Sequence, residues 1–264
     1  MNNLYVISTP IGNLNDLSLR AISLFKDLEI IYCEDTRTSS PLVKKYNPKI
    51  KLISLHKFNE KQQIDSVLLN LKSKDVGLIS DAGTPTINDP GQLLIKHLKQ
   101  QKIKIIPVPG ASALTTAISI SGLEYNSFNF IGFLPKKEKA IIDLVNNNLN
   151  NDLLVAYESP NRIKKTLSTL HHHFGNIQVC LARELTKFYE EIITDNIENL
   201  LNNEYKGEIV LIINTRTIAK QNNLLKETIS LYKKEGINNK SILNLLSSTT
   251  NFKKNDIYEE LKND

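Results

Sequence analysis

The chain has 264 residues, of which 41% are hydrophobic and 23% charged, and its formal net charge is +5. This composition is that of an ordinary globular protein, and the length allows one large or two modest domains. No apolar run approaches the roughly 18 residues of a membrane span, and no leader pattern opens the chain, so we expect a cytoplasmic protein. The positive charge is mild evidence for a polyanionic partner.

Strands and helices alternate over the first part of the chain. Apolar runs predict strands at 4–7, 30–33, 51–55, 76–79 and 103–108. Helical spacing is found between them, at 17–28, 64–71, 93–98 and 111–120. Such alternation favours right-handed crossovers and a mostly parallel sheet, in which every strand-to-helix loop leaves at the same edge. We therefore expect a first parallel α/β domain, residues 1–114.

Four loops of this domain are rich in Gly, Pro and acidic residues. They are STPIGN (8–13), CEDTR (33–37), DAGTPTINDPG (81–91) and PGASA (109–113). Gly and Pro hold the backbone in special conformations and few side chains block close approach, which suits a ligand gripped by peptide groups. In the alternative, purely structural interpretation, Asp81 and Asp89 only form hydrogen bonds with their own backbone in a long capped turn. The expected convergence of the loops on one rim favours a binding site.

The pattern changes in the second half of the chain. Strands are expected at 128–134, 153–157, 177–182 and 207–213, and several follow one another without a helix between them, which predicts a second, mixed α/β domain, residues 115–219. Strand signals vanish from residue 220. Short helices around 224–231, 242–246 and 256–261 predict a small lysine-rich helical appendage, residues 220–264, which contacts nucleic acid or covers the second domain.

Several common kinds of site are excluded by the motifs. The chain has no G-x-G-x-x-G fingerprint for a dinucleotide and no Gly-Lys pair for a P-loop. The run at 171–173 is three consecutive histidines, which cannot all face one ion from a regular element. Cys33 and Cys180 lie far apart and without a C-x-x-C partner, so neither a disulfide framework nor a zinc site is indicated. We expect no bound metal.

Seven motifs follow one another along roughly residues 4–215: TPIGN, EDTR, DAGTPxxxDPG, PGxSA, GFLPxK, ExPxR and RELTKxYEE. In this order they resemble the tetrapyrrole-methylase superfamily, the class III S-adenosylmethionine-dependent methyltransferases. Within it they are most similar to the ribosomal RNA small-subunit methyltransferase I family. The chain departs from that pattern at Thr86, at Asn88, where Ser is usual, and at Lys137 and Lys139, where arginines are common.

The resemblance implies an activity and an architecture. The expected reaction is methyl transfer from S-adenosylmethionine to a ribose 2′-hydroxyl of a cytidine in the decoding region of small-subunit ribosomal RNA. The expected enzyme is a homodimer of two-domain subunits, each with the cofactor in the cleft between its domains. Its substrate would be the RNA within an assembled or nearly assembled subunit.

The resemblance also implies roles for particular residues. A polar cradle for the cofactor is expected from Pro10, Gly12, Asp81, Ala82, Gly83, Pro109, Gly110, Ser112 and Ala113. The candidate catalytic groups, one of which would accept the hydroxyl proton, are Lys187, Glu184 and Asp35, with Lys136 near the same cleft. Contacts to RNA are expected from Arg37, Lys136, Arg162 and Arg183.

Two other functions compete with this prediction. A methyltransferase of the same fold that acts on a carbon of a tetrapyrrole precursor is the nearer one, although the EDTR and GFLPxK motifs and the basic balance argue against it. The other is a noncatalytic RNA-binding or ribosome assembly protein. That protein would bind RNA in a salt-sensitive way, without cofactor uptake or methyl transfer.

Overall fold

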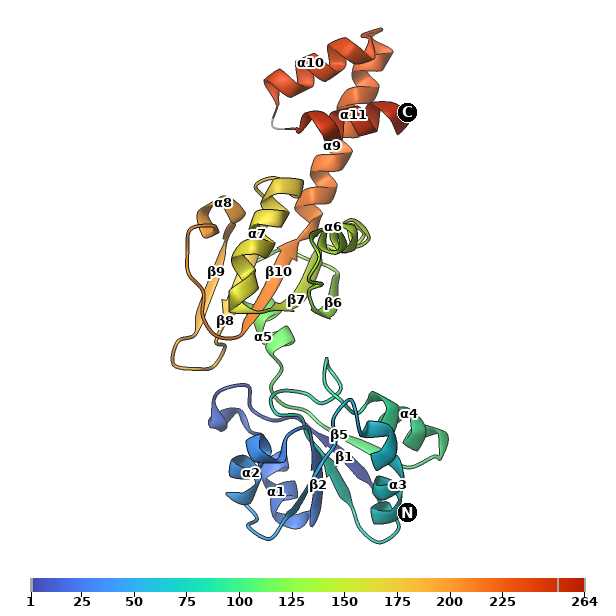
Figure 1. The fold of residues 1–264 in the computed structure, drawn as a ribbon, viewed down its shortest axis with the longest axis vertical. Helices are drawn as coiled ribbons and strands as arrows, with labels where there is room; N and C mark the ends of the chain where they lie inside the picture. Colours follow the sequence, from blue (N-terminus) through green and yellow to red (C-terminus); the bar gives the residue numbers. More distant parts are fainter. Residues whose placement is uncertain (1, 251, 264) are drawn as a thin grey trace.

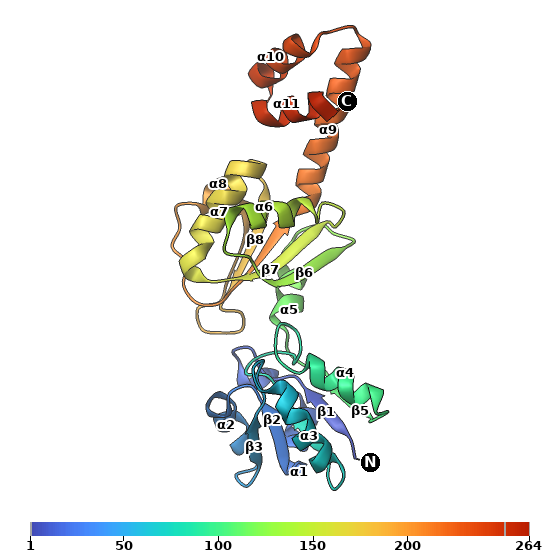
Figure 2. The same cartoon turned by 45° about the vertical axis from the view of Figure 1, so that its right-hand side comes forward.

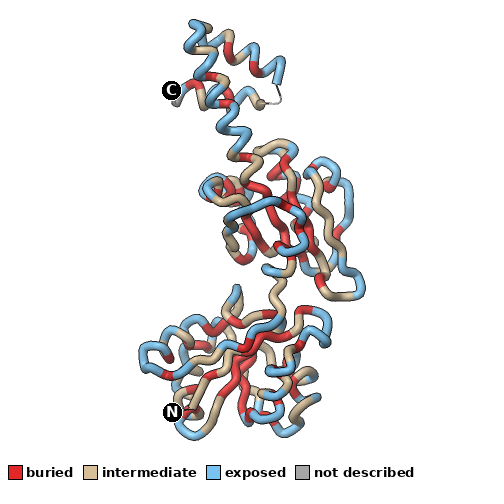
Figure 3. The backbone as a smooth tube through the Cα atoms, turned by 180° about the vertical axis from the view of Figure 1, so that it is seen from behind, coloured by how far each residue is buried: buried red, intermediate tan, exposed pale blue. Residues whose placement is uncertain are grey.

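Two sheets, each with its own helices, follow one another along the length of the molecule, and a group of helices ends the chain (Figure 1). The computed structural model describes residues 2–250 and 252–263. Buried residues concentrate on the strands of both sheets (Figure 3), so each sheet has its own core. The expected α/β class with two domains is confirmed.

The first sheet is parallel throughout, with the order β3-β2-β4-β1-β5. Its strands are β1 Leu4–Ile7, β2 Ile30–Cys33, β3 Lys51–Ser54, β4 Val76–Leu78 and β5 Ile105–Val108. The helices that follow them are α1 Leu19–Asp27 (after the short 3₁₀ helix η1, Leu14–Asp16), α2 Thr36–Lys44, α3 Glu60–Leu71 and α4 Gln92–Gln100. The α1–α2 pair and the α3–α4 pair belong to separate apolar clusters, one on each face of the sheet.

The second sheet is mixed, with the order β6-β7-β10-β8-β9. Its strands are β6 Phe128–Phe133, β7 Leu153–Glu158, β8 Gln178–Arg183, β9 Glu191–Asn196 and β10 Ile209–Asn214, and only the β6–β7 pair is parallel. Helices α6 Glu138–Asn146, α7 Pro160–Phe174 and α8 Ile197–Leu200 belong to the apolar cluster of one face. Helix α5 Ala113–Ile120 belongs to that of the other face.

Strand β9 has no counterpart among the predicted strands. Its sequence, EIITDN, follows the charged loop RELTKFYE directly, and every residue of the strand stays partly exposed. An edge strand buries little apolar surface, so its hydrophobic signal is weak.

The C-terminal helices are longer than the sequence predicts. Helix α9 begins at Thr215, directly after β10, and runs without a break to Lys234, so it already includes residue 220. Helices α10 Asn239–Thr249 and α11 Lys254–Asn263 pack beside its far end (Figure 2). The apolar cluster here is built from these three helices and the turns that join them, so the appendage makes its own small core. No helix among the described residues is long and apolar enough to cross a membrane.

Candidate functional site

The four loops of the first domain that are rich in Gly, Pro or acidic residues meet at one rim, as expected. Thr9 and Gly83 exchange two backbone hydrogen bonds, of 2.9 and 3.0 Å. The Thr84 hydroxyl donates to the carbonyl oxygen of Ala111 at 3.1 Å, which joins the second of these loops to a third. The fourth loop is attached through the backbone N–H of Asp35, which donates to Asp81 Oδ1 at 3.1 Å.

The loop between β4 and α4 holds an unusual backbone. Gly83, Thr86, Asn88 and Gly91 all have positive φ, between 66° and 117°. A β-branched residue such as Thr86 is strained there, and such strain persists only where the surroundings over-determine the conformation. The Gln92 amide contributes by donating to the Thr86 carbonyl oxygen at 3.0 Å. Loops with such a strained backbone, held in place by hydrogen bonds, are typical of ligand-binding sites.

The second domain faces this rim with the loop between β8 and β9. Glu184 and Thr186 also have positive φ, of 49° and 66°. Lys187 Nζ lies 2.9 Å from Glu184 Oε1 and 2.7 Å from Glu208 Oε2, so its ammonium is held between two carboxylates. Burial by itself lowers the pKa of Lys187, but the hydrogen bonds to Glu208 and Glu184 together outweigh it and raise the pKa, so the side chain stays charged at neutral pH.

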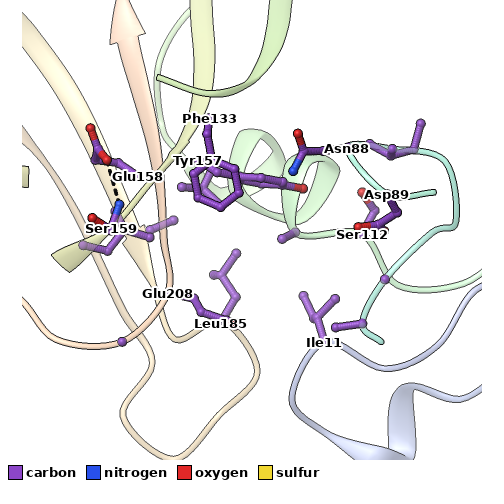
Figure 4. Close-up of a pocket in the computed structure, with 18 of the residues that line it drawn as sticks. Ile11, Asn88, Asp89, Ser112, Phe133, Tyr157, Glu158, Ser159, Leu185 and Glu208 are labelled. Atoms are coloured by element: carbon purple, nitrogen blue, oxygen red, sulfur yellow. Dashed lines mark hydrogen bonds between the residues drawn. The ribbon is translucent and has the colours of Figure 1, made fainter. Parts of the chain in front are cut away.

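A cavity of about 420 Å³ lies between the two domains. Figure 4 shows side chains converging on it from both sides. The first domain contributes the β4–α4 loop together with Ile11, Ser112 and Ala113. The second contributes the ends of β6, β7, β8 and β10, including Phe133, Tyr157, Leu185 and Glu208. Its size is that of a small-molecule site, and it has the interdomain position expected for the cofactor.

Negative charge dominates the polar part of the lining. Four of the lining residues are acidic, Asp81, Asp89, Glu158 and Glu208, although the Glu158 carboxylate is itself fully buried beside Arg162. The lining residues, all within the described part of the chain, include no lysine, arginine or histidine. The rest is largely apolar or aromatic. Such a cavity suits a ligand with a net positive charge and a flat apolar body.

Burial shapes the ionisation of this lining. It raises the pKa of Asp81. Burial, with the neighbouring charge of Glu34 second, raises the pKa of Asp89 to about 6. Burial and then the charge of Asp89 raise the pKa of Tyr157 to about 12, and in Figure 4 this side chain points across the cavity toward the loop that carries Asp89.

Five of the nine residues expected to cradle the cofactor line the cavity: Asp81, Ala82, Gly83, Ser112 and Ala113. Pro10, Gly12, Pro109 and Gly110 are not among the lining residues and shape the loops instead. A Cβ on Gly110 would lie 2.9 Å from Ser8 Cβ, so glycine permits the close approach of two loops there.

The expected catalytic candidates lie around the cavity and do not line it. Lys187 and Glu184 lie at the edge of the cavity, because both are hydrogen-bonded to the lining residue Glu208. The Glu208 backbone N–H donates to Glu184 Oε1 at 2.9 Å. Asp35 caps α2 by accepting from the Arg37 N–H at 2.8 Å. Hydrogen bonds from Arg37 lower the pKa of Asp35 to about 2.

The four expected RNA contacts differ in exposure. Lys136 is exposed, and Arg37 is 90% exposed beside Asp35. Arg183 pairs with Glu191. Arg162 is engaged inside the protein, because its Nη2 donates to the carbonyl oxygens of Leu134 at 3.1 Å and Pro135 at 2.6 Å.

Sequence reasoning missed several lining residues. Tyr157 and Glu158 belong to a predicted strand end and to the ExPxR motif, so a signal for them was present. Asp89 lies in the DPG of the β4–α4 loop. Glu208 follows Gly207 just before a strand, where no motif marks it. Its contact with Lys187 becomes visible only in the folded structure.

Solved structures share this two-domain fold. A diphthine synthase superposes with a TM-score of 0.65 at 14% identity, covering 83% of this chain and 95% of that one. A cobalt precorrin-4 methyltransferase superposes with a TM-score of 0.59 at 15% identity, covering 81% of this chain and 95% of that one. The family match and the relatives described below make the chain an S-adenosylmethionine-dependent methyltransferase of the class III type, and its fold agrees with that class.

The chain belongs to the family of Tetrapyrrole (Corrin/Porphyrin) Methylases, which it matches over residues 3–201. A protein of Pasteurella multocida (strain Pm70) is 37% identical over 98% of this chain and 98% of its own length. One of Hydrogenobaculum sp. (strain Y04AAS1) is 42% identical over 86% of this chain and 99% of its own length. Both are named ribosomal RNA small subunit methyltransferase I. The superfamily expected from the motifs is confirmed.

Proposed function

We propose that the protein methylates a ribose 2′-hydroxyl of a cytidine in the decoding region of small-subunit ribosomal RNA. The observation that carries this proposal is the identity of 37–42% over most of the chain with relatives named for that RNA. The fold agrees with the tetrapyrrole alternative, but the structures that share the fold and are named for such substrates are only 12–16% identical. No observation favours the noncatalytic alternative over an enzyme.

The cavity fits S-adenosylmethionine through charge and shape. When bound, this cofactor supplies a methyl group on a positively charged sulfur, and its amino acid part carries an ammonium. The carboxylates of Asp81 and Asp89 complement these positive charges. Asp81 is suited to accept from the ammonium, and the backbone groups of Ala82, Gly83, Ser112 and Ala113 offer the remaining polar contacts.

The protein's own part in the reaction is alignment and proton removal. Holding the sugar oxygen in line with the methyl group supplies much of the rate, and a base takes the hydroxyl proton. The raised pKa of Lys187 suits contact with a phosphate group better than proton acceptance. The lowered pKa values of Glu184 and Asp35 make these carboxylates weak bases.

Positive side chains outside the cavity are suited to the RNA backbone. Arg37, Lys136 and Arg183 are partly or fully exposed: Arg37 lies in the first turn of α2, Lys136 on a loop and Arg183 at the end of β8. We expect the acidic cavity to admit only the target ribose, while phosphates stay near these cations. A homodimer in the cytoplasm, acting on assembled or nearly assembled subunits, completes the proposal.

The decisive experiment is a map of ribose methylation on small-subunit RNA. We expect one cytidine of the decoding region to lose its 2′-O-methyl group in a strain that lacks the protein and to regain it on complementation. In a parallel assay, labelled S-adenosylmethionine should transfer methyl to small subunits and not to tetrapyrrole precursors. An unchanged map, or transfer to a tetrapyrrole, would reject the proposed substrate.

A further inference from the structure

We propose that Asp89 is the catalytic residue that accepts the proton of the ribose hydroxyl. This inference rests on the proposed RNA methylation and assigns a residue that the motifs left without a role. Three observations support it: the place of Asp89 in the cavity, the engagement of the other lining carboxylates, and the surroundings of its own carboxylate.

Asp89 is held where both domains meet. It lies in the β4–α4 loop between Asn88, whose φ is 66°, and the buried Pro90, so its backbone position is fixed. Its side chain lines the cavity, and Tyr157 of β7 points toward it from the opposite domain (Figure 4). A hydroxyl group that enters between the domains therefore meets this carboxylate.

Each of the other three lining carboxylates is occupied by the protein. Asp81 accepts from the Asp35 N–H at 3.1 Å, and Glu208 Oε2 lies 2.7 Å from Lys187 Nζ. Glu158 is bonded at both oxygens, by the Ser159 N–H at 2.8 Å and the Thr166 hydroxyl at 2.7 Å. Such donors favour the ionised form of a carboxylate and so make it a poorer base, which at Asp81 opposes the effect of burial.

The surroundings of Asp89 make it a better base than an ordinary aspartate. Burial raises its pKa first, then the charge of Glu34, with a further rise from Asp81, while a hydrogen bond from the Ser80 side chain and the charge of Lys57 oppose them. Tyr157, the neighbour on the second domain, stays neutral because its own pKa is raised to about 12. Asp89 thus has a pKa of about 6, close to the operating pH, where general bases work best.

The proposed step is balanced. The O–H bond of the ribose 2′-hydroxyl breaks, and its proton passes to a carboxylate oxygen of Asp89. The hydroxyl oxygen forms a bond to the methyl carbon as the carbon–sulfur bond breaks, and the electron pair of that bond stays on sulfur, which leaves as a neutral thioether. Asp89 then returns the proton to water.

The test compares Asp89→Asn with a matched control. Asp65→Asn makes the same chemical change on an exposed position of α3, away from the cavity. Affinity for S-adenosylmethionine and for its demethylated product is measured by calorimetry. Single-turnover methyl transfer to small subunits is followed from pH 5 to 8.5.

We expect Asp89→Asn to bind both ligands within about threefold of the wild type and to transfer methyl on the order of 100- to 10,000-fold more slowly. The wild-type and Asp65→Asn rates should rise through a pH near 6, and the residual Asp89→Asn rate should lack that rise.

Two results would overturn the assignment. Loss of cofactor affinity in proportion to rate would make Asp89 a cofactor ligand, and a rate within a few-fold of the wild type would leave it no part in proton transfer. If the wild type methylates no ribosomal RNA, the proposed function fails and the assignment fails with it. Methyl transfer by the wild-type protein alone distinguishes that outcome from the other two.

Discussion

The backbone N–H of Asn13 donates a hydrogen bond of 3.0 Å to the hydroxyl oxygen of Thr186, a residue 173 positions away in the chain. This bond joins the loop after β1 to the loop between β8 and β9, and so joins the two domains beside the cavity. Gly12 makes the approach possible, because a Cβ there would lie 2.5 Å from Lys187 Cγ and 2.7 Å from Thr186 Oγ1. The cavity therefore depends on contacts between loops of different domains.

Removing the Thr186 hydroxyl should loosen this junction. We expect Thr186→Val to lower the free energy of unfolding by about 1 kcal/mol, the net value of one hydrogen bond, and to weaken cofactor binding several-fold. Thr186→Ser keeps the hydroxyl and should behave like the wild type. Urea denaturation and calorimetry measure the two effects. Equal cofactor affinity in the Val and Ser variants would show that the bond does not hold the cavity together.

A methyl group at Gly132 should disturb the opposite side of the cavity. Gly132 has φ of 70°, and a Cβ on it would lie 2.5 Å from Asn88 Oδ1. Gly122 has φ of 67°, but among the residues that the structure describes no neighbouring atom lies within 4 Å of such a Cβ, so Gly122→Ala is a matched control for backbone strain. Both Ala variants should lose about 1–2 kcal/mol of stability.

Only Gly132→Ala should also displace Asn88, and we expect it to weaken cofactor binding on the order of tenfold. Adding Asn88→Gly to Gly132→Ala should recover most of that affinity, because glycine tolerates the positive φ at residue 88 and removes the clash. Equal cofactor affinity in the Gly122→Ala and Gly132→Ala variants would contradict this account.

Arg162 should contribute more to stability than to RNA binding. Its guanidinium lies 3.3 Å from the fully buried carboxylate of Glu158. Breaking a buried pair costs about 3–5 kcal/mol, and we expect Arg162→Met to fall at the low end because Glu158 keeps other donors. Glu158→Gln in the same chain should recover part of the loss.

Lys164→Met is the control for Arg162→Met, since Lys164 lies on the same helix and pairs with Glu204 at the surface. That change should cost at most about 0.5 kcal/mol in urea denaturation. Equal losses of unfolding free energy in the two variants would show that the Arg162–Glu158 pair stabilises the protein no more than a surface ion pair does.

The raised pKa of Asp89 should be visible in the stability of the protein without ligand. A carboxyl whose folded-state pKa is about 6 against 3.8 contributes stability that is present below pH 3.8 and lost as the pH rises through 6. Asp89→Asn should therefore match the wild type near pH 4 and exceed it by on the order of 1 kcal/mol at pH 7–8, after allowance for solvent screening. A difference that does not change with pH would place the folded-state pKa of Asp89 near its ordinary value.

Arg37 offers a test of RNA contact that spares the cofactor. Its side chain is exposed at the rim, and lysine cannot reproduce its planar fork. Arg37→Lys should lower RNA methylation while cofactor affinity holds, and Arg216→Lys, outside the lining, should change neither. Methylation assays and calorimetry are needed together, and an equal loss of methylation and cofactor affinity in Arg37→Lys would reject the RNA contact.

The rim of the first domain was predictable because the regular alternation of strands and helices implies one common edge for its loops. Asp81 and Gly83 were found in this way. Glu208 was not, since only the packing of the second domain brings it beside Lys187. The Thr186 contact was not either, since it depends on how the two domains meet, which no local pattern encodes. Strand β9 was missed because an edge strand buries too little to leave a hydrophobic period.

Helix α9 sets both the reach and the orientation of the C-terminal helices. Its 20 residues, at about 1.5 Å each, form a rod of about 30 Å between β10 and the far end where α10 and α11 pack. Because each residue also turns the rod by about 100°, deleting four residues would shorten it by about 6 Å and rotate the far end by about 40°. The terminal helices are thus presented at a fixed height and angle, which a change in the length of α9 would alter while their own core stays intact.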